Sequence, residues 1–454
     1  MEPLYLGLGT AVAALGLVAV LTHPNYRNIV SFLLGVSAGL VGVQIFRIHA
    51  FTILAVLWAC LPQETRNRNA PKHVAAVAVA AVLLASTTYL GELVNSATLG
   101  LQLLGLAGSA ALVALRASRS DAKALLWGLL VISTLGSAVG VLQVFRIIPM
   151  DLWHLDISTV GRPTGIYPEP DWLGMFAGVG TILAWRLSMS RALKVSFVLL
   201  NLSVLVLAMA RAAWVALLVT IAVGWLASAV SRRRNQAAAE GAGSGDGGRR
   251  GRILALVAVS VAAPIVLSAV PQLQEDLALR VSTMMGTVQE DDISGQARIR
   301  QNDSLVALAE SVPVYGHGLS AAGRVGVWGQ INTEGASENN VASNWVLGMW
   351  VDGAWFAVPL VVYLIGLALA RVPTLPGQLL LFTLVCSLFS NAVFFPVTWF
   401  LVGLAITAVR ARPASQVPAP PAEARLDLRK KRPRHRMEQP VFGRGTAGRL
   451  MQHD

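Results

Sequence analysis

Arginine side chains at three places in this sequence could bind the oxygens of a phosphate or diphosphate group. Arg162 begins a loop rich in proline and glycine, and Arg211 stands alone between two apolar runs. Arg298 and Arg300 lie further along, on a polar stretch that suits a helix. The guanidinium group is planar and offers paired N–H donors, which match phosphate oxygens. Because Arg298 and Arg300 would lie about 200° apart on a helix, at most one of them would face a given ligand.

Four other side chains could accept a proton from a reacting hydroxyl group, namely Glu169, Glu338, Asp352 and His317. A carboxylate or an imidazole acts as a general base when it lies within hydrogen-bond reach of that hydroxyl. Two of these have a structural alternative. His317 lies in a Gly-His-Gly turn, where a capping or surface role is commoner, and Asp352 could pair with an arginine of a neighbouring helix. Asn344 and Tyr167 could position an acceptor.

We expect neither a metal ion nor a cofactor. The sequence has two cysteines, Cys60 and Cys386, and both lie in apolar runs. This placement argues against a disulfide framework and against a cysteine-rich metal site.

The composition indicates that these residues belong to a membrane protein. Of the 454 residues, 55% are hydrophobic and 13% are charged. A soluble globular protein has about 25% charged residues, because its surface must face water. Apolar runs of about 17–25 residues recur along the chain, and each can cross about 30 Å of hydrocarbon as a helix.

The sequence therefore predicts an all-α fold, a polytopic membrane bundle of about twelve or thirteen transmembrane helices with one large external loop containing short helices. The segment 49–62 is the doubtful span, because it is short. We expect no cleavable signal peptide, because the first span follows no basic segment. The predicted spans lie near 3–22, 28–46, 49–62, 74–90, 99–115, 124–145, 172–186, 195–210, 212–230, 253–270, 344–370, 377–393 and 396–411.

The distribution of lysine and arginine predicts which connections face the cytoplasm. Basic residues gather in alternate connections, so the formal net charge of +12 reflects topology and contact with anionic lipid rather than nucleic-acid binding. The segment 271–343 has no lysine, which favours the outer side. We expect N-terminal transmembrane helices over 1–270 with a cytoplasmic linker at 231–252, an external loop over 271–343, C-terminal transmembrane helices over 344–411, and a basic, disordered cytoplasmic tail over 412–454.

Local patterns suggest how the arginines are positioned. Proline and glycine residues enforce a tight path after Arg162, either to hold it near the lipid head groups or simply to form a rigid loop. Arg211 either reaches the outer interface along its aliphatic stem or leaves its guanidinium open to phosphate oxygens. From residue 297 the loop suits an amphipathic helix on the membrane, with Leu305, Leu308 and Val312 facing lipid.

Taken in order, these features resemble the O-antigen ligase and O-antigen polymerase superfamily, from about residue 120 to 410. The resemblance rests on an Arg-x-x-Gly-x-Tyr-x-Glu-Pro loop from Arg162 and an Ala-Arg-Ala-Ala-Trp span start around Arg211. The long loop then contains Pro-Val-Tyr-Gly-His-Gly-Leu, and after it come Ser-Asn-Trp, the Asp352-Gly353 step and a final Phe-Phe-Pro hairpin turn. The order and spacing of these fragments carry the resemblance.

The resemblance implies an inverting, metal-independent glycosyltransferase at the outer face of the bacterial cytoplasmic membrane. Its donor would be an oligosaccharide on a polyprenyl diphosphate such as undecaprenyl diphosphate, and its acceptor a glycan or lipid-glycan. Arginines of the family hold the diphosphate, which points here to Arg162 and Arg211, with Arg298 or Arg300 from the loop. The implied surroundings are the lipid bilayer, with no nucleic acid.

One departure from the family pattern favours a polymerase over a ligase. Ligases of the superfamily carry an essential histidine directly before the asparagine that opens the helix after the loop, whereas this sequence has Ala342-Ser343-Asn344. Either another group serves as base, namely Glu169, Glu338 or Asp352, or the protein is a polymerase-type member. We therefore favour a polymerase of an exopolysaccharide, capsule or O-antigen repeat over a lipid A–core ligase. The alternatives from other classes are a flippase or transporter for lipid-linked glycans, and a non-catalytic scaffold of an envelope assembly complex.

Overall fold

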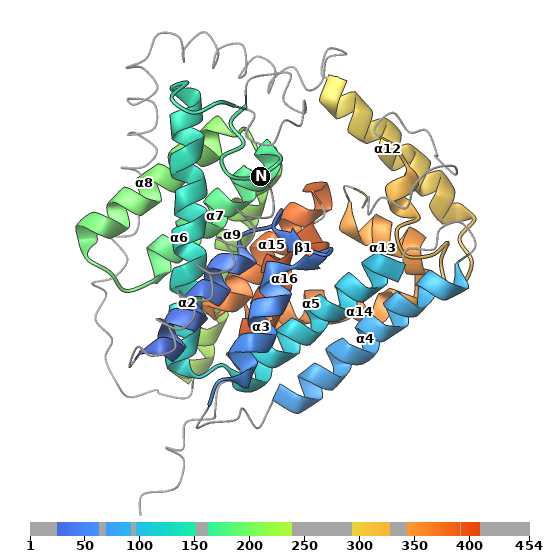
Figure 1. The fold of residues 1–454 in the computed structure, drawn as a ribbon, viewed down its shortest axis with the longest axis horizontal. Helices are drawn as coiled ribbons and strands as arrows, with labels where there is room; N and C mark the ends of the chain where they lie inside the picture. The colour runs from blue at the N-terminus through green and yellow to red at the C-terminus, as the bar shows by residue number, and fades with distance from the viewer. Residues whose placement is uncertain are drawn as a thin grey trace, which may run out of the picture. The chain divides into compact units, whose positions relative to one another are not determined.

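The computed structural model describes residues 25–62, 70–91, 97–150, 162–237, 293–326, 342, 344–390 and 392–408. These residues form thirteen α-helices, which confirms the predicted all-α class. The predicted spans 3–22 and 253–270 lie outside the described residues. The α-helices, drawn in Figure 1, are α2 Tyr26–Ala38, α3 Ala50–Cys60, α4 Ala70–Leu90, α5 Ala97–Arg116, α6 Arg119–Val144, α7 Pro170–Arg186, α8 Arg191–Leu207, α9 Arg211–Ala237, α12 Ile293–Glu310, α13 Trp345–Gly353, α14 Val358–Arg371, α15 Leu375–Ser390 and α16 Pro396–Thr407.

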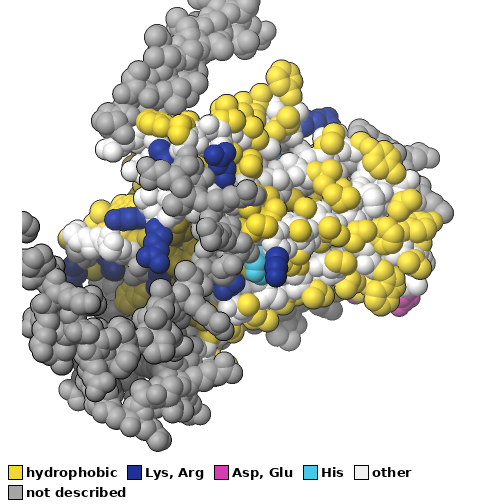
Figure 2. Space-filling model, turned by 90° about the horizontal axis from the view of Figure 1, so that it is seen from below, with side chains coloured by type: hydrophobic (Ala, Val, Ile, Leu, Met, Phe, Trp, Pro, Cys, Tyr) yellow, Lys and Arg dark blue, Asp and Glu magenta, His cyan; other side chains and the backbone are white. Residues whose placement is uncertain are grey.

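Apolar helices of membrane-spanning length are present. By length and composition, α4, α5, α6 and the first part of α9 can each cross a membrane, and α3, α14, α15 and α16 are shorter apolar helices. Apolar side chains are also exposed on these helices, for example Leu101 at 70%, Leu218 at 68% and Val362 at 63%. In Figure 2 hydrophobic side chains cover most of one part of the surface. Apolar surface of this extent needs a partner such as lipid.

The core is built by close helix packing. Along α16 every residue from Pro396 to Ile406 is buried, and the helix contacts α5 and α15. A helix that is buried all round belongs in the middle of a bundle. Helices α2 and α6 approach through glycines: Gly35 lies against the Leu125 carbonyl, and Gly128 lies against the Phe32 carbonyl. A side chain at either glycine would push the two backbones apart.

Each end of α6 contacts a different set of loops. At its start, Asp121 accepts hydrogen bonds of 2.9 and 3.0 Å from Arg27 of α2, which also donates to the Pro62 carbonyl after α3. At its other end, Gln143 accepts a 3.0 Å hydrogen bond from the backbone N–H of Thr164. The 26 residues of α6 separate these ends by roughly 39 Å, at about 1.5 Å per residue.

The predicted span 28–46 is shorter in the structure. Helix α2 ends at Ala38, and two short antiparallel strands follow, β1 Gln44–Ile45 and β2 Ile48–His49, with Gln44 opposite His49. The residues between the strands, Phe46 and Arg47, have φ of +51° and +65°. These left-handed angles form a turn that a helix cannot continue through.

The predicted span 344–370 is broken in the structure. Helix α13 stops at Gly353, the 3₁₀ turn η3 covers Ala354–Phe356, and α14 begins at Val358. Ala354 has φ of +42°, and the N–H of Trp355 donates to the Val314 carbonyl, 3.2 Å away. The preceding loop therefore supplies hydrogen bonds that an unbroken helix would have made internally.

The predicted helix in the long loop exists, but its apolar face does not face lipid along its whole length. Leu305 of α12 is fully buried in a small cluster with Ala321, Ala322 and Val351, and Leu308 packs against the same cluster. Leu305 and Leu308 have protein partners because the chain after α12 folds back against α13, whereas Ile299 and Val306 of the same helix are exposed. This fold-back includes the short 3₁₀ turn η2, Ala322–Arg324.

Candidate functional site

Arg162 ties the loop before α7 to the end of α8. Its Nε donates to the carbonyl oxygen of Ala208 at 2.8 Å, and its Nη2 donates to Oδ1 of Asp171 at 2.6 Å. The two charged side chains are 23% and 16% exposed. Arg162 thus lies in a partly buried ion pair, with its guanidinium held against the α8–α9 turn.

Arg211 lies at the same turn, as the first residue of α9. The turn is sharp because Met209 has φ of +51°, and Trp214 fixes it by donating from Nε1 to the Leu205 carbonyl at 2.9 Å. Arg211 is exposed. The N-terminus of a helix carries a partial positive charge, which adds to that of the arginine. The guanidinium of Arg162 and the backbone of Arg211 therefore lie at the same turn.

Tyr167 and Glu169 follow Arg162 on the same loop. The Tyr167 ring is 1% exposed and stacks on Phe176 of α7, with the ring centroids 4.5 Å apart. Its side chain packs in the core instead of lining the surface where an acceptor would bind. Glu169 immediately precedes α7 and is half-buried, and its side chain makes no capping hydrogen bond to that helix.

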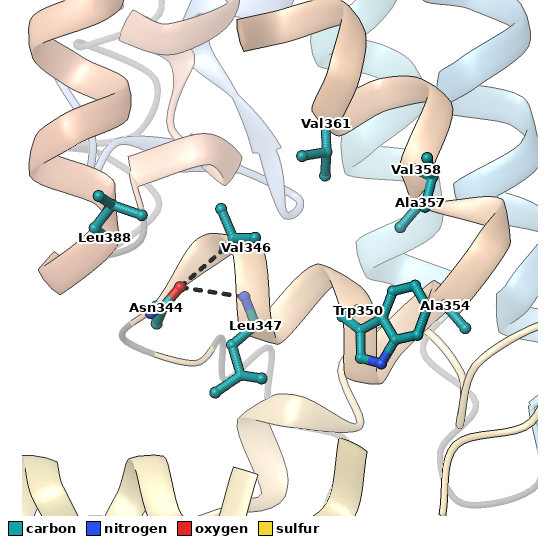
Figure 3. Close-up of a pocket in the computed structure, with 9 residues that line it drawn as sticks. All are labelled: Asn344, Val346, Leu347, Trp350, Ala354, Ala357, Val358, Val361 and Leu388. Carbon is teal, nitrogen blue, oxygen red and sulfur yellow. Dashed lines mark hydrogen bonds between the residues drawn. The ribbon is translucent and has the colours of Figure 1, made fainter. Parts of the chain in front are cut away.

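Asn344 caps α13 and borders a pocket. Its Oδ1 accepts hydrogen bonds from the N–H groups of Val346 and Leu347, at 3.1 and 3.2 Å. The pocket, shown in Figure 3, has a volume of about 520 Å³. It lies between α13, α14 and Leu388 of α15. Its lining residues are mostly aliphatic: Asn344, Val346, Leu347, Trp350, Ala354, Ala357, Val358, Val361 and Leu388.

His317 is a buried residue of the turn that docks on the end of α13. Its backbone N–H donates to the Val351 carbonyl at 2.9 Å, and its Nε2 donates to the Leu308 carbonyl at 3.1 Å. A carbonyl can only accept, so Nε2 is the donor in this contact. The neighbouring Gly318 packs against Gly91 at the end of α4. The sequence alternative of a structural histidine fits these contacts.

Asp352 binds the backbone of the same turn. The residue is 3% exposed, and its Oδ1 accepts a 2.7 Å hydrogen bond from the N–H of Ala322. The N–H groups of Ser320 and Ala321 also point to this carboxylate. Sequence reasoning expected either a catalytic carboxylate or a partner for an arginine. The partners in the structure are backbone N–H groups, which a sequence pattern does not reveal.

The remaining candidates lie on the long loop. Arg300 is exposed on α12, which contacts α13, and Arg298 lies on the same helix, where the structure describes its backbone. Glu338 lies outside the described residues. Arg300 is not among the lining residues of the pocket in Figure 3. Within the described part of the chain, no group of three or more His, Cys, Asp or Glu side chains could hold a metal ion.

One comparison with known proteins matches the middle of the chain. Residues 195–353 match the family model described as O-antigen ligase. The matched segment runs from α8 through the Arg211 turn and α12 to the end of α13. A comparison with curated proteins found no match. This segment is therefore similar to the O-antigen ligase family, which supports the resemblance that the motifs had suggested.

Proposed function

We propose that this protein polymerises a glycan at the outer face of the cytoplasmic membrane, using a polyprenyl-diphosphate-linked oligosaccharide as donor. The match to the O-antigen ligase family model supports a membrane glycan-transfer role of the ligase or polymerase type. The proposal adds the donor, the side of the membrane and the choice of polymerase.

The observation that carries the proposal is that the guanidinium of Arg162 binds the α8–α9 turn, from which Arg211 begins α9. Arg162 binds the carbonyl of Ala208 at 2.8 Å, and Arg211 follows that residue by three positions. Two guanidinium groups beside the N-terminus of a 27-residue helix favour a ligand that carries two adjacent phosphates. Asp171 balances part of this charge and fixes the orientation of Arg162.

In the proposed reaction a hydroxyl oxygen of the acceptor attacks the anomeric carbon of the donor sugar. The bond from this carbon to the diphosphate oxygen breaks, and the electron pair leaves with the diphosphate. The two arginines stabilise the negative charge that develops there. Attack occurs opposite the leaving group, so the configuration at the anomeric carbon inverts.

Glu169 is the base that we propose for the hydroxyl proton. It lies on the same loop as Arg162 and is half-buried. The two other described candidates, Asp352 and His317, are engaged with backbone groups of the turn against α13. A carboxylate within hydrogen-bond reach of the acceptor would take the proton as the new bond forms.

The aliphatic pocket between α13 and α14 suits part of the hydrocarbon chain of the carrier. A volume of about 520 Å³ is in the usual range for a small-molecule site. Its lining offers one polar side chain, Asn344, among aliphatic and aromatic residues. An isoprenoid chain would bind to such a surface, because its binding free energy comes mainly from the burial of apolar area.

The choice of polymerase depends on the residues before α13. Where ligases of the superfamily have a histidine, this chain has Ser343, which follows Ala342, a fully buried residue of the cluster around Leu305. Asn344 is committed to capping the helix. The acceptor is then proposed to be a growing glycan, and the product a series of longer chains.

The experiment is a transfer assay with purified protein and a polyprenyl-diphosphate oligosaccharide. We expect a ladder of products from the wild type and at least about a 100-fold lower rate from Arg211→Ala, as for loss of a group that stabilises transition-state charge. Arg191→Ala is the matched control, because Arg191 is likewise an exposed first residue of a helix, but at the other end of α8. It should keep the wild-type rate.

Three outcomes would overturn parts of the proposal. Equal rates for the Arg211 and Arg191 variants would remove the diphosphate role of the α8–α9 turn. A single transfer to a lipid acceptor, without a ladder, would indicate a ligase. Full activity of Glu169→Gln would exclude Glu169 as the base.

A further inference from the structure

Gln143 is a fully buried polar residue near the end of α6, and it binds the loop that carries Arg162. Its side-chain oxygen accepts hydrogen bonds from the N–H groups of Thr164 and Gly165, at 3.0 and 2.6 Å. Both residues lie directly after Arg162-Pro163. Gln143 is 0% exposed. Loss of its side chain would be costly, because no water could take its place as the acceptor for these two N–H groups.

The side-chain nitrogen of Gln143 binds both sides of the same loop. Within 3.1–3.3 Å of it lie the carbonyls of Pro149, Met150 and Gly165, and the hydroxyl of Thr164. One carboxamide thus connects the chain after α6 to the chain before α7. A glutamine can do this because it offers two donors and one acceptor with two lone pairs.

The segment next to Gln143 has little freedom to adjust. Gly165 has φ of +62°, and a Cβ on it would lie 2.5 Å from the Gly136 carbonyl oxygen. Tyr167 continues the turn by donating from its N–H to the Thr164 carbonyl at 3.0 Å. The position of Thr164 and Gly165 therefore determines where the backbone of Arg162 lies, and so whether its side chain can bind the Ala208 carbonyl.

We propose that Gln143 is a positioning residue for the guanidinium of Arg162. It acts by holding Thr164 and Gly165, two and three residues after Arg162, and does not itself contact the donor. This inference rests on the proposed function, in which Arg162 binds the diphosphate. Displacement of a group that stabilises developing charge by about 1 Å can lower a rate by about 100-fold.

The first test is a double-mutant cycle with Gln143→Met and Arg162→Lys. We expect Gln143→Met to lower kcat about 10- to 100-fold, with less than a threefold change in the KM for the donor, because the carrier chain contributes most of the binding. If Gln143 acts through Arg162, the double variant will be no more than about twofold slower than Arg162→Lys alone.

A purely structural role predicts a different cycle. The two effects would then multiply, because general loosening of the α6–α7 region lowers activity whether or not Arg162 is present. Wild-type activity of Gln143→Met would also overturn the inference. If Arg162→Lys and Arg162→Ala were both fully active, the proposed function would fail first, so the two failures are distinguishable.

Gln143→Glu provides a second test should the methionine variant not fold. A neutral carboxylic acid keeps one donor and one acceptor, whereas the carboxylate has no donor for the oxygens around it. We expect the activity of Gln143→Glu relative to wild type to rise at least about fivefold as pH falls from about 8 to about 5.5. An unchanged ratio would contradict the inference.

The pH dependence of Gln143→Glu also depends on the charged groups around α6. Among the described residues at the Gln143 end they are Arg146 after the helix, Glu169 before α7, and Arg162 and Asp171, which pair with each other. The others lie on the elements packed against α6, towards its Asp121 end: Arg27 of α2, which pairs with Asp121, Arg186 at the end of α7, and Arg191 and Lys194 in the first turn of α8.

The control is Gln102→Glu. Gln102 also donates from its side chain to a backbone carbonyl, that of Arg47 at 2.7 Å, but it is not fully buried and lies on α5. Its variant should show the pH profile of the wild type.

Discussion

Replacing Asp352 separates two roles that a buried carboxylate can have. The structure indicates an anchor: the side chain is 3% exposed, and the N–H groups of Ala322, Ser320 and Ala321 point to it. Asp352→Ala leaves the buried N–H groups of Ala322 and Ser320 without this acceptor, whereas the N–H of Ala321 also donates to the Gly318 carbonyl, at 2.9 Å. At about 1 kcal/mol for each of the two groups, the lower end of the usual range, the loss is about 2 kcal/mol.

Asp352→Asn should be much milder. The asparagine oxygen can still accept the N–H of Ala322, so the turn stays docked while the negative charge and the proton acceptor are lost. We expect this variant to lose at most about 1 kcal/mol, the difference between a charge-assisted and a neutral hydrogen bond. It should keep at least about half of the wild-type transfer rate.

The assay combines thermal unfolding in detergent, followed by tryptophan fluorescence, with the rate of glycan transfer. Trp345 and Trp350 lie on α13 itself and report on its surroundings. We expect Asp352→Ala to unfold several degrees below the wild type, with Asp352→Asn close to the wild type in both measurements. A stable Asp352→Asn protein with a rate reduced about 100-fold would refute the anchor and make Asp352 the base.

Three further predictions concern packing around the site. Gly165→Ala should lower stability by about 2–4 kcal/mol, because it combines a left-handed φ with contacts of 2.5 and 2.8 Å to Gly136 and Leu173; an unchanged unfolding midpoint would contradict this. Leu305→Ala should cost about 2–5 kcal/mol by leaving a cavity under α12, measured as faster proteolysis of the long loop, whereas a lipid-facing Leu305 would give no change. Val361→Trp should fill the pocket and raise KM about 10-fold for a long-chain donor but less than twofold for a short-chain analogue; equal effects on both would remove the pocket as a lipid site.

Hydrophobicity predicted most of the fold, because a membrane selects long apolar helices directly from the sequence. It failed where loops compete for hydrogen bonds. Asp352-Gly353 and Pro359 are local signals for a break in the apolar run 344–370, but they do not reveal that the N–H of Trp355 bonds to Val314, about forty residues earlier in the chain. The apolar face of α12 was assigned to lipid because periodicity identifies an apolar face but not what covers it.

The candidate site was predictable in part for a similar reason. Arginines in unusual surroundings stand out in the sequence, and Arg162 does bind the turn from which Arg211 begins α9. Their local partners do not stand out. A glutamine at the end of an apolar helix, such as Gln143, carries no pattern, and neither does the backbone that Asp352 binds. Such roles depend on tertiary contacts between segments distant in sequence.

The central claim is that Arg162 and Arg211 bind the diphosphate of a lipid carrier. It is tested most directly by comparing the Kd of purified protein for farnesyl diphosphate and farnesyl monophosphate. The account predicts that the wild type binds the diphosphate at least about 10-fold more tightly, and that Arg162→Gln/Arg211→Gln loses this preference while still binding the monophosphate. An unchanged preference in the double variant would contradict the account.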